Sequence, residues 1–256
     1  MDTVYIGIDP TAGRRPMDYT ILDGDLKLVT RGLGKLDKVL EVARQYPAAV
    51  VAVDAPQSPN TGLMATAARR KNYGLPANTT TWADYKVGEY ELRQRGIRLY
   101  NTPGEAEAAP KWMQLGFELY ESLKADGFQI YRPRADAPRQ VLEVHPHASY
   151  TVLLGHVPMR KDSLEGRLQR QLLLFQEGVD LPDPMDAFEE ITRHHLLEGT
   201  LTLPGLLTHD ELDALVSAYT AYLAVRHPER ITAVGDPDEG QIVVPVAPEN
   251  FKEVYR

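Results

Sequence analysis

Four aspartates are the residues of this chain whose types and spacing could do chemistry. Asp9 and Asp54 each end a short apolar run. Asp210 and Asp213 open the stretch "THDELDALVSAYTAYLA" at residues 208–224 and, being three positions apart, are neighbours on a helix surface. Carboxylates gathered at one place can hold a catalytic metal ion. Each aspartate could also have only a structural role. Which role applies depends on the strands and helices that position the aspartates.

The start of the late helix has two interpretations. Thr208 fits the N-cap position, and Glu211 stands where the acid of a capping box reaches back to it. Acids in a first helical turn also suit the positive end of the helix dipole. The alternative is that Asp210 and Asp213 are half of a metal-binding carboxylate cluster. The stretch alone leaves both interpretations open.

The two other aspartates follow apolar segments that are typical of buried strands. "TVYIGID" ends at Asp9, and "AAVVAVDAP" carries Asp54 at its end. An Asp23-Gly24 turn between two further strand-like runs predicts a hairpin, and apolar residues at helical spacing over 36–43 predict a crossover helix. The two apolar strands should then be parallel neighbours with both carboxylates at one rim. The alternative is that each aspartate only starts a loop or caps a helix.

Composition limits the class of protein. The 256 residues contain 43% hydrophobic and 25% charged residues, which is typical of a globular protein with one main core, and we expect a single domain over 1–256. The absence of cysteine excludes disulfides and thiolate metal sites. We find no membrane span or signal peptide, so we expect a cytoplasmic protein. The net charge of −8 means that a nucleic acid would need a local basic patch.

A loop-rich segment, residues 57–139, interrupts the strand and helix rhythm, and we interpret it as an insertion. It carries the densest positive charge of the chain, which predicts contacts to a substrate, although exposed basic residues are also common on ordinary solvated surfaces. These candidate substrate-binding residues are Arg69, Arg70, Lys71 and Arg93, with Arg95 and Arg98 nearby.

The remaining segments complete a mixed α/β pattern. "RQVLEVHPHASY" predicts a strand with Glu143 and His145 on one face. Two helices are expected over 162–199 and one over 209–226, followed by a short strand-like tail. In the helix over 209–226, alanines at 214, 218 and 221 form a stripe of small residues that would allow close packing on a sheet.

Five short motifs in this order resemble a known group of proteins. They are "IGID", "AVDAPQ", "LEVHP", "DELDALVSAYTAYL" and "EGQIVVP". Together they are similar to domain of unknown function family 429, a family of predicted nucleases in the RNase H-like superfamily, and the likeness runs from residue 4 to about 246. The resemblance implies an α/β, RNase H-like fold with a mixed five-stranded sheet flanked by helices. It also implies an Mg²⁺ or Mn²⁺ site formed by Asp9, Asp54, Asp210 and Asp213.

The activity that follows from the resemblance is hydrolysis of phosphodiester bonds in DNA or RNA. Two metal ions about 4 Å apart would activate water and stabilise the leaving oxygen. Asp9 would bridge both ions. Glu143 is a fifth acid that either supports a ligand, replaces one or pairs with an arginine. His145 and His209 could carry protons, or they could be structural.

Two other functions compete with the nuclease. One is a non-catalytic RNase H-like module that binds a nucleic acid or a protein, which the net charge of −8 favours mildly. The other is an ATP-dependent phosphotransferase of the actin-like group, because "GIDPTAG" at residues 7–13 is similar to its first phosphate loop. That group needs a duplicated core and a second glycine-rich loop, and the sequence shows neither.

Overall fold

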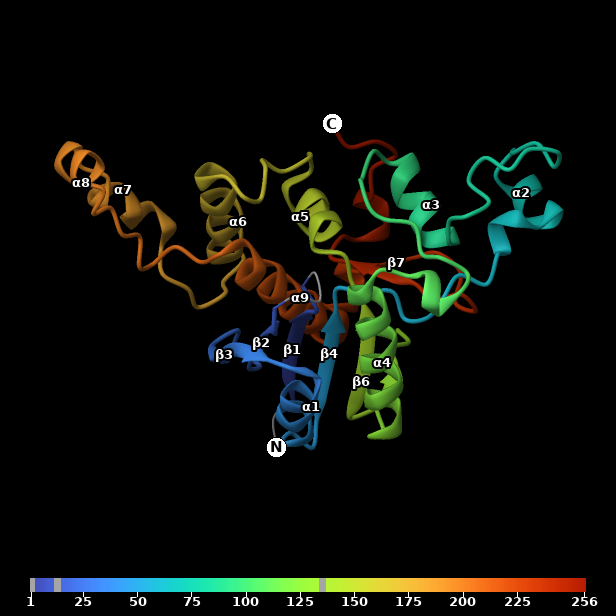
Figure 1. The fold of residues 1–256 in the computed structure, drawn as a ribbon, viewed down its shortest axis with the longest axis horizontal. Helices are drawn as coiled ribbons and strands as arrows, with labels where there is room; N and C mark the ends of the chain where they lie inside the picture. The colour runs from blue at the N-terminus through green and yellow to red at the C-terminus, as the bar shows by residue number, and fades with distance from the viewer. Residues whose placement is uncertain (1–2, 12–14, 134–136) are drawn as a thin grey trace.

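A single mixed β-sheet lies at the centre of the fold (Figure 1). The computed structural model describes residues 3–11, 15–133 and 137–256. Within these residues the sheet has eight strands in the order β3-β2-β1-β4-β6-β8-β7, with β5 also paired to β6. The strands are β1 (Val4–Asp9), β2 (Met17–Leu22), β3 (Leu28–Gly34), β4 (Ala49–Val53), β5 (Gln129–Ile130), β6 (Arg139–Glu143), β7 (Thr232–Val234) and β8 (Ile242–Val244).

The first half of the sheet confirms the predicted strand, hairpin and crossover. β1, β2 and β3 are antiparallel neighbours, and in the turn after β2 the carboxylate of Asp23 accepts hydrogen bonds from the backbone N–H groups of Asp25 and Lys27 at 2.8 and 2.9 Å. Helix α1 (Leu36–Arg44) then crosses to β4, which is parallel to β1 and lies between β1 and β6. This connection aligns the carboxyl ends of β1 and β4.

Helices cover both faces of the sheet. Alternate strand residues point to opposite faces, so Tyr5 and Val50 pack in a core with α9, whereas Ile6 and Val51 pack in a core with α1 and α4. The longer helices after α1 are α3 (Val87–Gln94), α4 (Lys111–Ala125), α5 (Pro146–Leu154), α6 (Leu164–Gln176) and α9 (His209–Arg226), and the shorter ones are α2 (Ala67–Asn72), α7 (Ala187–Glu190) and α8 (Arg193–Glu198). Among the described helices none is a candidate membrane span, because each is too short or too polar.

Close packing of α9 on β1 fixes the late aspartates relative to the sheet. A Cβ added to Gly7 would lie 1.8 Å from the carbonyl oxygen of Ala214 and 2.5 Å from the backbone nitrogen of Ala218, so only glycine fits there. The structure confirms that the alanine stripe allows close packing on the sheet. It also confirms the bounds predicted for this helix. As a result, the first turns of α9 lie beside the carboxyl end of β1.

The structure differs from the predictions in the width of the sheet and in the region before α9. The α/β class is confirmed. The predicted strand-like tail forms β8, which joins the sheet beside β6, and an additional strand, β7, pairs antiparallel with β8. The second helix expected within 162–199 is replaced by the short helices α7 and α8. Prolines at 182 and 184 interrupt this region, and Thr192 starts α8 by accepting the His195 N–H.

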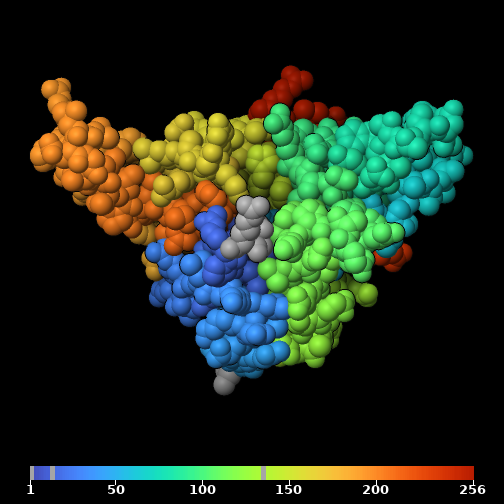
Figure 2. Space-filling view, viewed as in Figure 1, coloured from blue at the N-terminus to red at the C-terminus, as the bar shows by residue number. Residues whose placement is uncertain are grey.

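The segment 57–139 divides between two parts of the molecule. Its first part forms a small lobe, residues 63–94, here called the α2 lobe, whose core includes Met64, Val87 and Tyr90. Its last part contributes α4 and β5 to the central sheet and its helical cover. Figure 2 shows the α2 lobe as one wing of a triangular outline, with α7 and α8 on the other wing. That 57–139 is one insertion stays a prediction.

Candidate functional site

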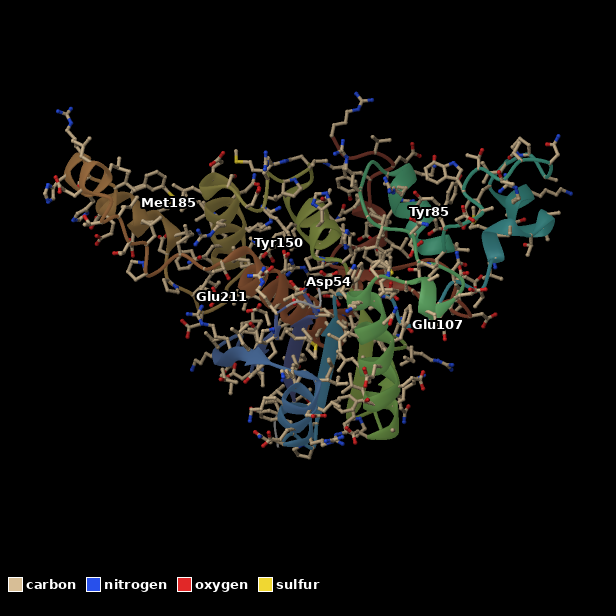
Figure 3. All side chains as sticks on the ribbon, viewed as in Figure 1. Asp54, Tyr85, Glu107, Tyr150, Met185 and Glu211 are labelled. Carbon is tan, nitrogen blue, oxygen red and sulfur yellow. The ribbon has the colours of Figure 1, made fainter. Side chains whose placement is uncertain are left out.

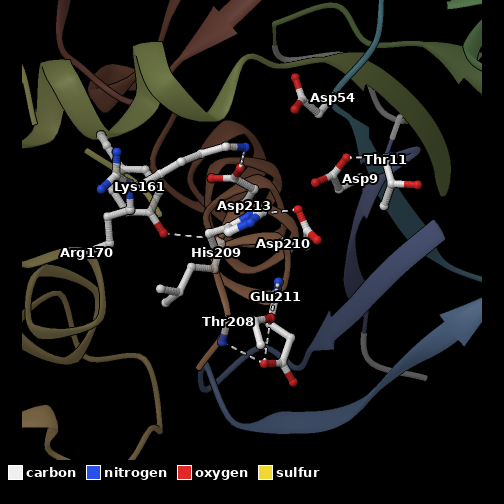
Figure 4. Close-up of polar contacts among 12 residues, drawn as sticks. Asp9, Thr11, Asp54, Lys161, Arg170, Thr208, His209, Asp210, Glu211 and Asp213 are labelled. Atoms are coloured by element: carbon white, nitrogen blue, oxygen red, sulfur yellow. Dashed lines mark hydrogen bonds and ion pairs between the residues drawn. The ribbon is translucent and has the colours of Figure 1, made fainter. Parts of the chain in front are cut away.

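Two aspartates lie side by side where neighbouring parallel strands end. Asp9 is the last residue of β1, and Asp54 directly follows β4. The Asp54 N–H donates to the carbonyl of Ile8 at 2.9 Å, which extends the pairing of the two strands to these residues. Helix α9 brings Asp213 to the same place, as Figure 4 shows. The structure thus brings Asp9, Asp54 and Asp213 together, and Asp210, the fourth aspartate predicted to bind metal, lines the same pocket as Asp9 and Asp54.

The three carboxylates repel each other in a buried setting. Asp9 is only 7% exposed, and burial, reinforced by the negative charges of Asp54 and Asp213, raises its pKa to about 8. One Asp9 oxygen accepts the Thr11 N–H at 2.7 Å, which favours the ionised form and only partly offsets the repulsion. A carboxylate held this way favours either a proton or a nearby cation.

Lys161 supplies a cation to the cluster. Its Nζ donates a hydrogen bond to Oδ2 of Asp213 at 2.6 Å. Asp213 is 3% exposed, whereas the Lys161 side chain, from the loop between α5 and α6, is half exposed. Burial alone would lower the pKa of Lys161, but the charge and hydrogen bond of Asp213 outweigh burial and raise it. Lys161 is therefore held in its charged form.

Asp210 has different partners from Asp213. It lies 2.7 Å from Nδ1 of His209 and 3.1 Å from the guanidinium of Arg15, at the rim of the cluster. The predicted capping box is confirmed: Thr208 accepts the Glu211 N–H, and Glu211 accepts the Thr208 N–H at 2.8 Å. The cap therefore does not use either aspartate. Asp210 joins a surface ion-pair group, while Asp213 is directed into the cluster.

His145 contacts the cluster from the start of α5. Its Nε2 donates to the carbonyl of Arg98 at 3.1 Å, and its Nδ1 lies 3.6 Å from the Asp54 carboxylate. With Nε2 as a donor, Nδ1 attracts that carboxylate best when it also carries a proton. Burial lowers the pKa of His145, but Asp54 outweighs burial and raises it. The Asp54 carboxylate thus favours the protonated form of His145.

These groups surround an open pocket of about 350 Å³. Asp9, Asp54 and Asp210 line it together with Lys161 and Arg15. The pocket also has an aromatic side, formed by Tyr100 and Trp112, whose rings meet edge to face with centroids 4.8 Å apart. Such a mixture of acids, cations and a flat apolar wall suits a charged ligand with an aromatic part.

Glu143, the fifth candidate acid, lies outside this pocket. It ends β6 and is 1% exposed, and one of its oxygens accepts the Gln57 N–H at 3.0 Å. Burial raises the pKa of Glu143 to about 7, and the charge of Lys86 partly opposes the rise. In the described part of the chain Glu143 forms no ion pair with an arginine. Of its three predicted roles, pairing with an arginine therefore does not apply, whereas supporting or replacing a metal ligand stays a prediction.

The predicted substrate-binding cations do not form one patch. Arg70 is 1% exposed and donates to the carbonyls of Pro76, Met64 and Thr81 and to the hydroxyl of Thr79, so this prediction is corrected: Arg70 holds the α2 lobe together. Its charge is not available to a ligand because the polar atoms around it already accept its hydrogen bonds.

The other predicted cations have mixed surroundings. Arg69 forms an ion pair with Asp236, Lys71 is exposed, and the guanidinium of Arg93 lies 5.5 Å from the centre of the Tyr85 ring. Figure 3 shows Tyr85 in the wing formed by the α2 lobe, whereas Asp54 lies near the centre of the molecule. These cations therefore lie apart from the acidic cluster. Arg95 packs over Phe251, with its guanidinium 4.4 Å from the ring centre, and Arg98 is exposed beside His145.

Sequence reasoning missed the two cations of the pocket. Arg15 follows Asp9 by six residues, so its place in the loop after the first strand was a usable signal. Lys161 precedes Asp213 by 52 residues and stands in a loop among other charged residues, which gave no signal. Residues 12 and 13, the last two of the "GIDPTAG" stretch, lie outside the described residues.

The chemistry of the cluster suits Mg²⁺ or Mn²⁺, but its spacing is not that of a complete ligand sphere. Carboxylate oxygens are the preferred ligands of these hard cations, and the pKa of Asp9 is raised by burial first and then by the charges of Asp54 and Asp213. Over the described ranges, however, no three His, Asp or Glu side chains are placed so that they could hold one metal ion. Asp213 is instead bound by Lys161.

Comparison with known proteins places the chain in a family. Residues 7–239 match the family described as "Protein of unknown function (DUF429)". No curated protein and no solved structure matches the chain. Because the family match covers well over half of the 256 residues, the chain belongs to the DUF429 family.

Proposed function

We propose that this protein is a metal-dependent nuclease with an RNase H-like fold. The observation that carries the proposal is the meeting of Asp9, Asp54 and Asp213 at the carboxyl ends of β1 and β4, where burial and mutual repulsion raise the pKa of Asp9 to about 8. Keeping three acids together is costly for a fold unless a cation compensates them. Strands β3-β2-β1-β4-β6 also supply the five-stranded mixed core expected for that fold.

Each acid has a proposed role. Asp9, Asp54 and Asp213 would hold Mg²⁺ or Mn²⁺. The chemistry supplied by such an ion is activation of water and stabilisation of the leaving oxygen of a phosphodiester. Asp210 has a different role from the one expected from the sequence: it orients the ring of His209, 2.7 Å away, at the rim of the pocket. His209 can then carry a proton to or from the reacting groups at its other ring nitrogen.

The substrate-contacting groups are those of the pocket rather than those of the α2 lobe. Arg15, with a side chain 69% exposed, lies on the pocket wall and can bind a phosphate while remaining close to Asp210. Tyr100 and Trp112 offer ring surfaces against which a base can stack. Lys71 and the half-buried Arg69 and Arg93 are left as secondary contacts for a longer nucleic acid.

A second candidate function is a non-catalytic module that binds nucleic acid or protein. The ion pair between Lys161 and Asp213 favours it, because an internal cation already neutralises one of the acids. The net charge of −8 favours a protein partner over a nucleic acid. The two candidates differ in one measurable property, which is turnover that depends on a divalent cation.

A cleavage assay tests the proposal. The purified protein is incubated with single-stranded, double-stranded and branched DNA and with RNA, in Mg²⁺, in Mn²⁺ or in EDTA. We expect cleavage that requires Mg²⁺ or Mn²⁺ and falls by at least about 100-fold in Asp9→Asn and Asp54→Asn. Asp37→Asn, at an exposed acid of α1, is the matched control and should cleave like the parent. Cleavage that is absent for every substrate, or equal in EDTA, contradicts the proposal.

A further inference from the structure

The backbone of the loop that carries Lys161 is held in place by contacts with α6. Arg170 donates to the carbonyls of Met159 and Gly166, each at 2.9 Å, so its guanidinium links the loop that carries Lys161 to the first turn of α6. Gln169 accepts the Met159 N–H at 2.8 Å. The loop backbone is therefore fixed to α6, and only the lysine side chain is long and free enough to move.

The loop also packs directly on α6. A Cβ added to Gly166 would lie 1.8 Å from the carbonyl oxygen of Arg160, so the close approach requires glycine. The Ser163 side chain accepts the Gly166 N–H at 3.1 Å and donates to the Arg160 carbonyl at 2.9 Å. These contacts place the backbone of Lys161 at a constant position beside the acids.

The neighbours of Lys161 do not share its role. Arg160 and Asp162 pair with each other at 2.8 Å, with side chains 83% and 57% exposed. Of these three consecutive charged residues, only Lys161 reaches a buried carboxylate. Its charge also acts on Asp9, and the charges of Asp9 and Asp54 act on it in turn.

We propose that Lys161 is an exchangeable counter-ion: it neutralises Asp213 in the metal-free protein and leaves that carboxylate when a divalent cation binds. The metal part of this inference rests on the proposed function. The Lys161 ammonium, 2.6 Å from Oδ2 of Asp213, and a metal ion would compete for that carboxylate and repel each other. Exchange of the lysine for a metal ion explains why the three carboxylates lie close together and yet are not arranged as a complete set of metal ligands.

The pocket can accommodate the half-exposed Lys161 side chain after it leaves Asp213. When it leaves Asp213, its ammonium remains on the wall of the pocket, which Lys161 already lines together with Arg15. A phosphate bound beside the metal ion would then meet two cations from this chain. The same residue would thus protect the empty site and contact the substrate in the loaded site.

Metal affinity tests the exchange without requiring activity. Lys161→Met keeps the length of the side chain and removes its charge, and Arg160→Met is the matched control in the same loop. Isothermal titration with MnCl₂ should give a dissociation constant at least about tenfold lower for Lys161→Met than for the parent, because a competing positive charge is gone. Arg160→Met should stay within about twofold of the parent. An unchanged or weaker affinity in Lys161→Met overturns the exchange.

A second measurement separates this inference from the proposed function. If the parent binds no Mn²⁺, both the metal site and the exchange fail, but the counter-ion role can still be judged in metal-free protein. Lys161→Met should lower the melting temperature by several degrees, and adding Asp213→Asn to it should restore most of the loss, since the unpaired buried charge is then removed. Additive losses in the double variant overturn the counter-ion role.

Discussion

The α2 lobe and the carboxyl end of the central sheet both bury charged side chains, and their neighbours differ in kind. In the α2 lobe, Arg70 donates to three carbonyls and a hydroxyl. At the end of the sheet, Asp9, Asp54 and Asp213 face each other, with the Lys161 ammonium and the His145 ring beside them. The first arrangement completes the hydrogen bonds of one ion, whereas the second gathers ions of the same sign. Repulsion that a fold maintains, rather than charge alone, indicates a functional site.

The largest effect that follows from this comparison is expected at Arg70. Arg70→Met removes a buried guanidinium and leaves its acceptors unpaired, so we expect a loss of about 3 kcal/mol or more in the free energy of unfolding of the lobe. Urea unfolding monitored by Trp82, which packs in this lobe, measures the loss. Metal binding should not change.

The exposed neighbour Lys71 is the control for Arg70. Lys71→Met should change the free energy of unfolding by no more than about 0.5 kcal/mol. If instead Arg70→Met were as stable as the parent and bound nucleic acid more weakly, Arg70 would be a substrate contact and the contrast between the two regions would be lost.

A smaller effect is expected from the pKa of Asp9, which is about 8 in the folded protein against a usual 3.8. Between these values the folded state holds a proton that the unfolded state has lost, so raising the pH from about 4 to 8 destabilises the metal-free protein. Asp9→Asn removes this dependence and should be more stable than the parent by roughly 1–3 kcal/mol at pH 7.

Melting curves in EDTA at pH 5, 6, 7 and 8 measure this effect. The difference between Asp9→Asn and the parent should grow with pH, and Asp37→Asn should show no such trend because Asp37 is exposed. A difference that is constant or shrinks as the pH rises would mean that Asp9 is ionised without strain in the metal-free protein.

Local rules made the central part of the site predictable. Asp9 and Asp54 lie at the ends of apolar strands joined by one crossover helix, and the parallel pairing of these strands places both acids at one rim. Thr208 and Glu211 form the predicted cap because their spacing depends only on helix geometry. These features need no information from distant parts of the chain.

Features that depend on distant contacts were not predictable. Asp210 and Asp213 looked equivalent in the sequence, yet the approach of α9 to Gly7 directs Asp213 to the acids and leaves Asp210 with Arg15. The burial of Arg70 depends on how residues 76–81 fold over it, and a sequence shows the charge without its acceptors. Strand β8 lies in the predicted strand-like tail, whereas β7 has three residues, which is too short for a clear pattern.

Asp9, Asp54 and Asp213 together are the proposed site for a divalent cation. A crystal of the protein soaked in MnCl₂, measured at a wavelength where manganese scatters anomalously, tests it most directly. We expect an anomalous peak within coordination distance of oxygen atoms from all three carboxylates, at about 2.0–2.3 Å, with the Lys161 ammonium displaced from Asp213. A crystal that binds Mn²⁺ elsewhere, or none at all, while Lys161 stays on Asp213, would contradict it.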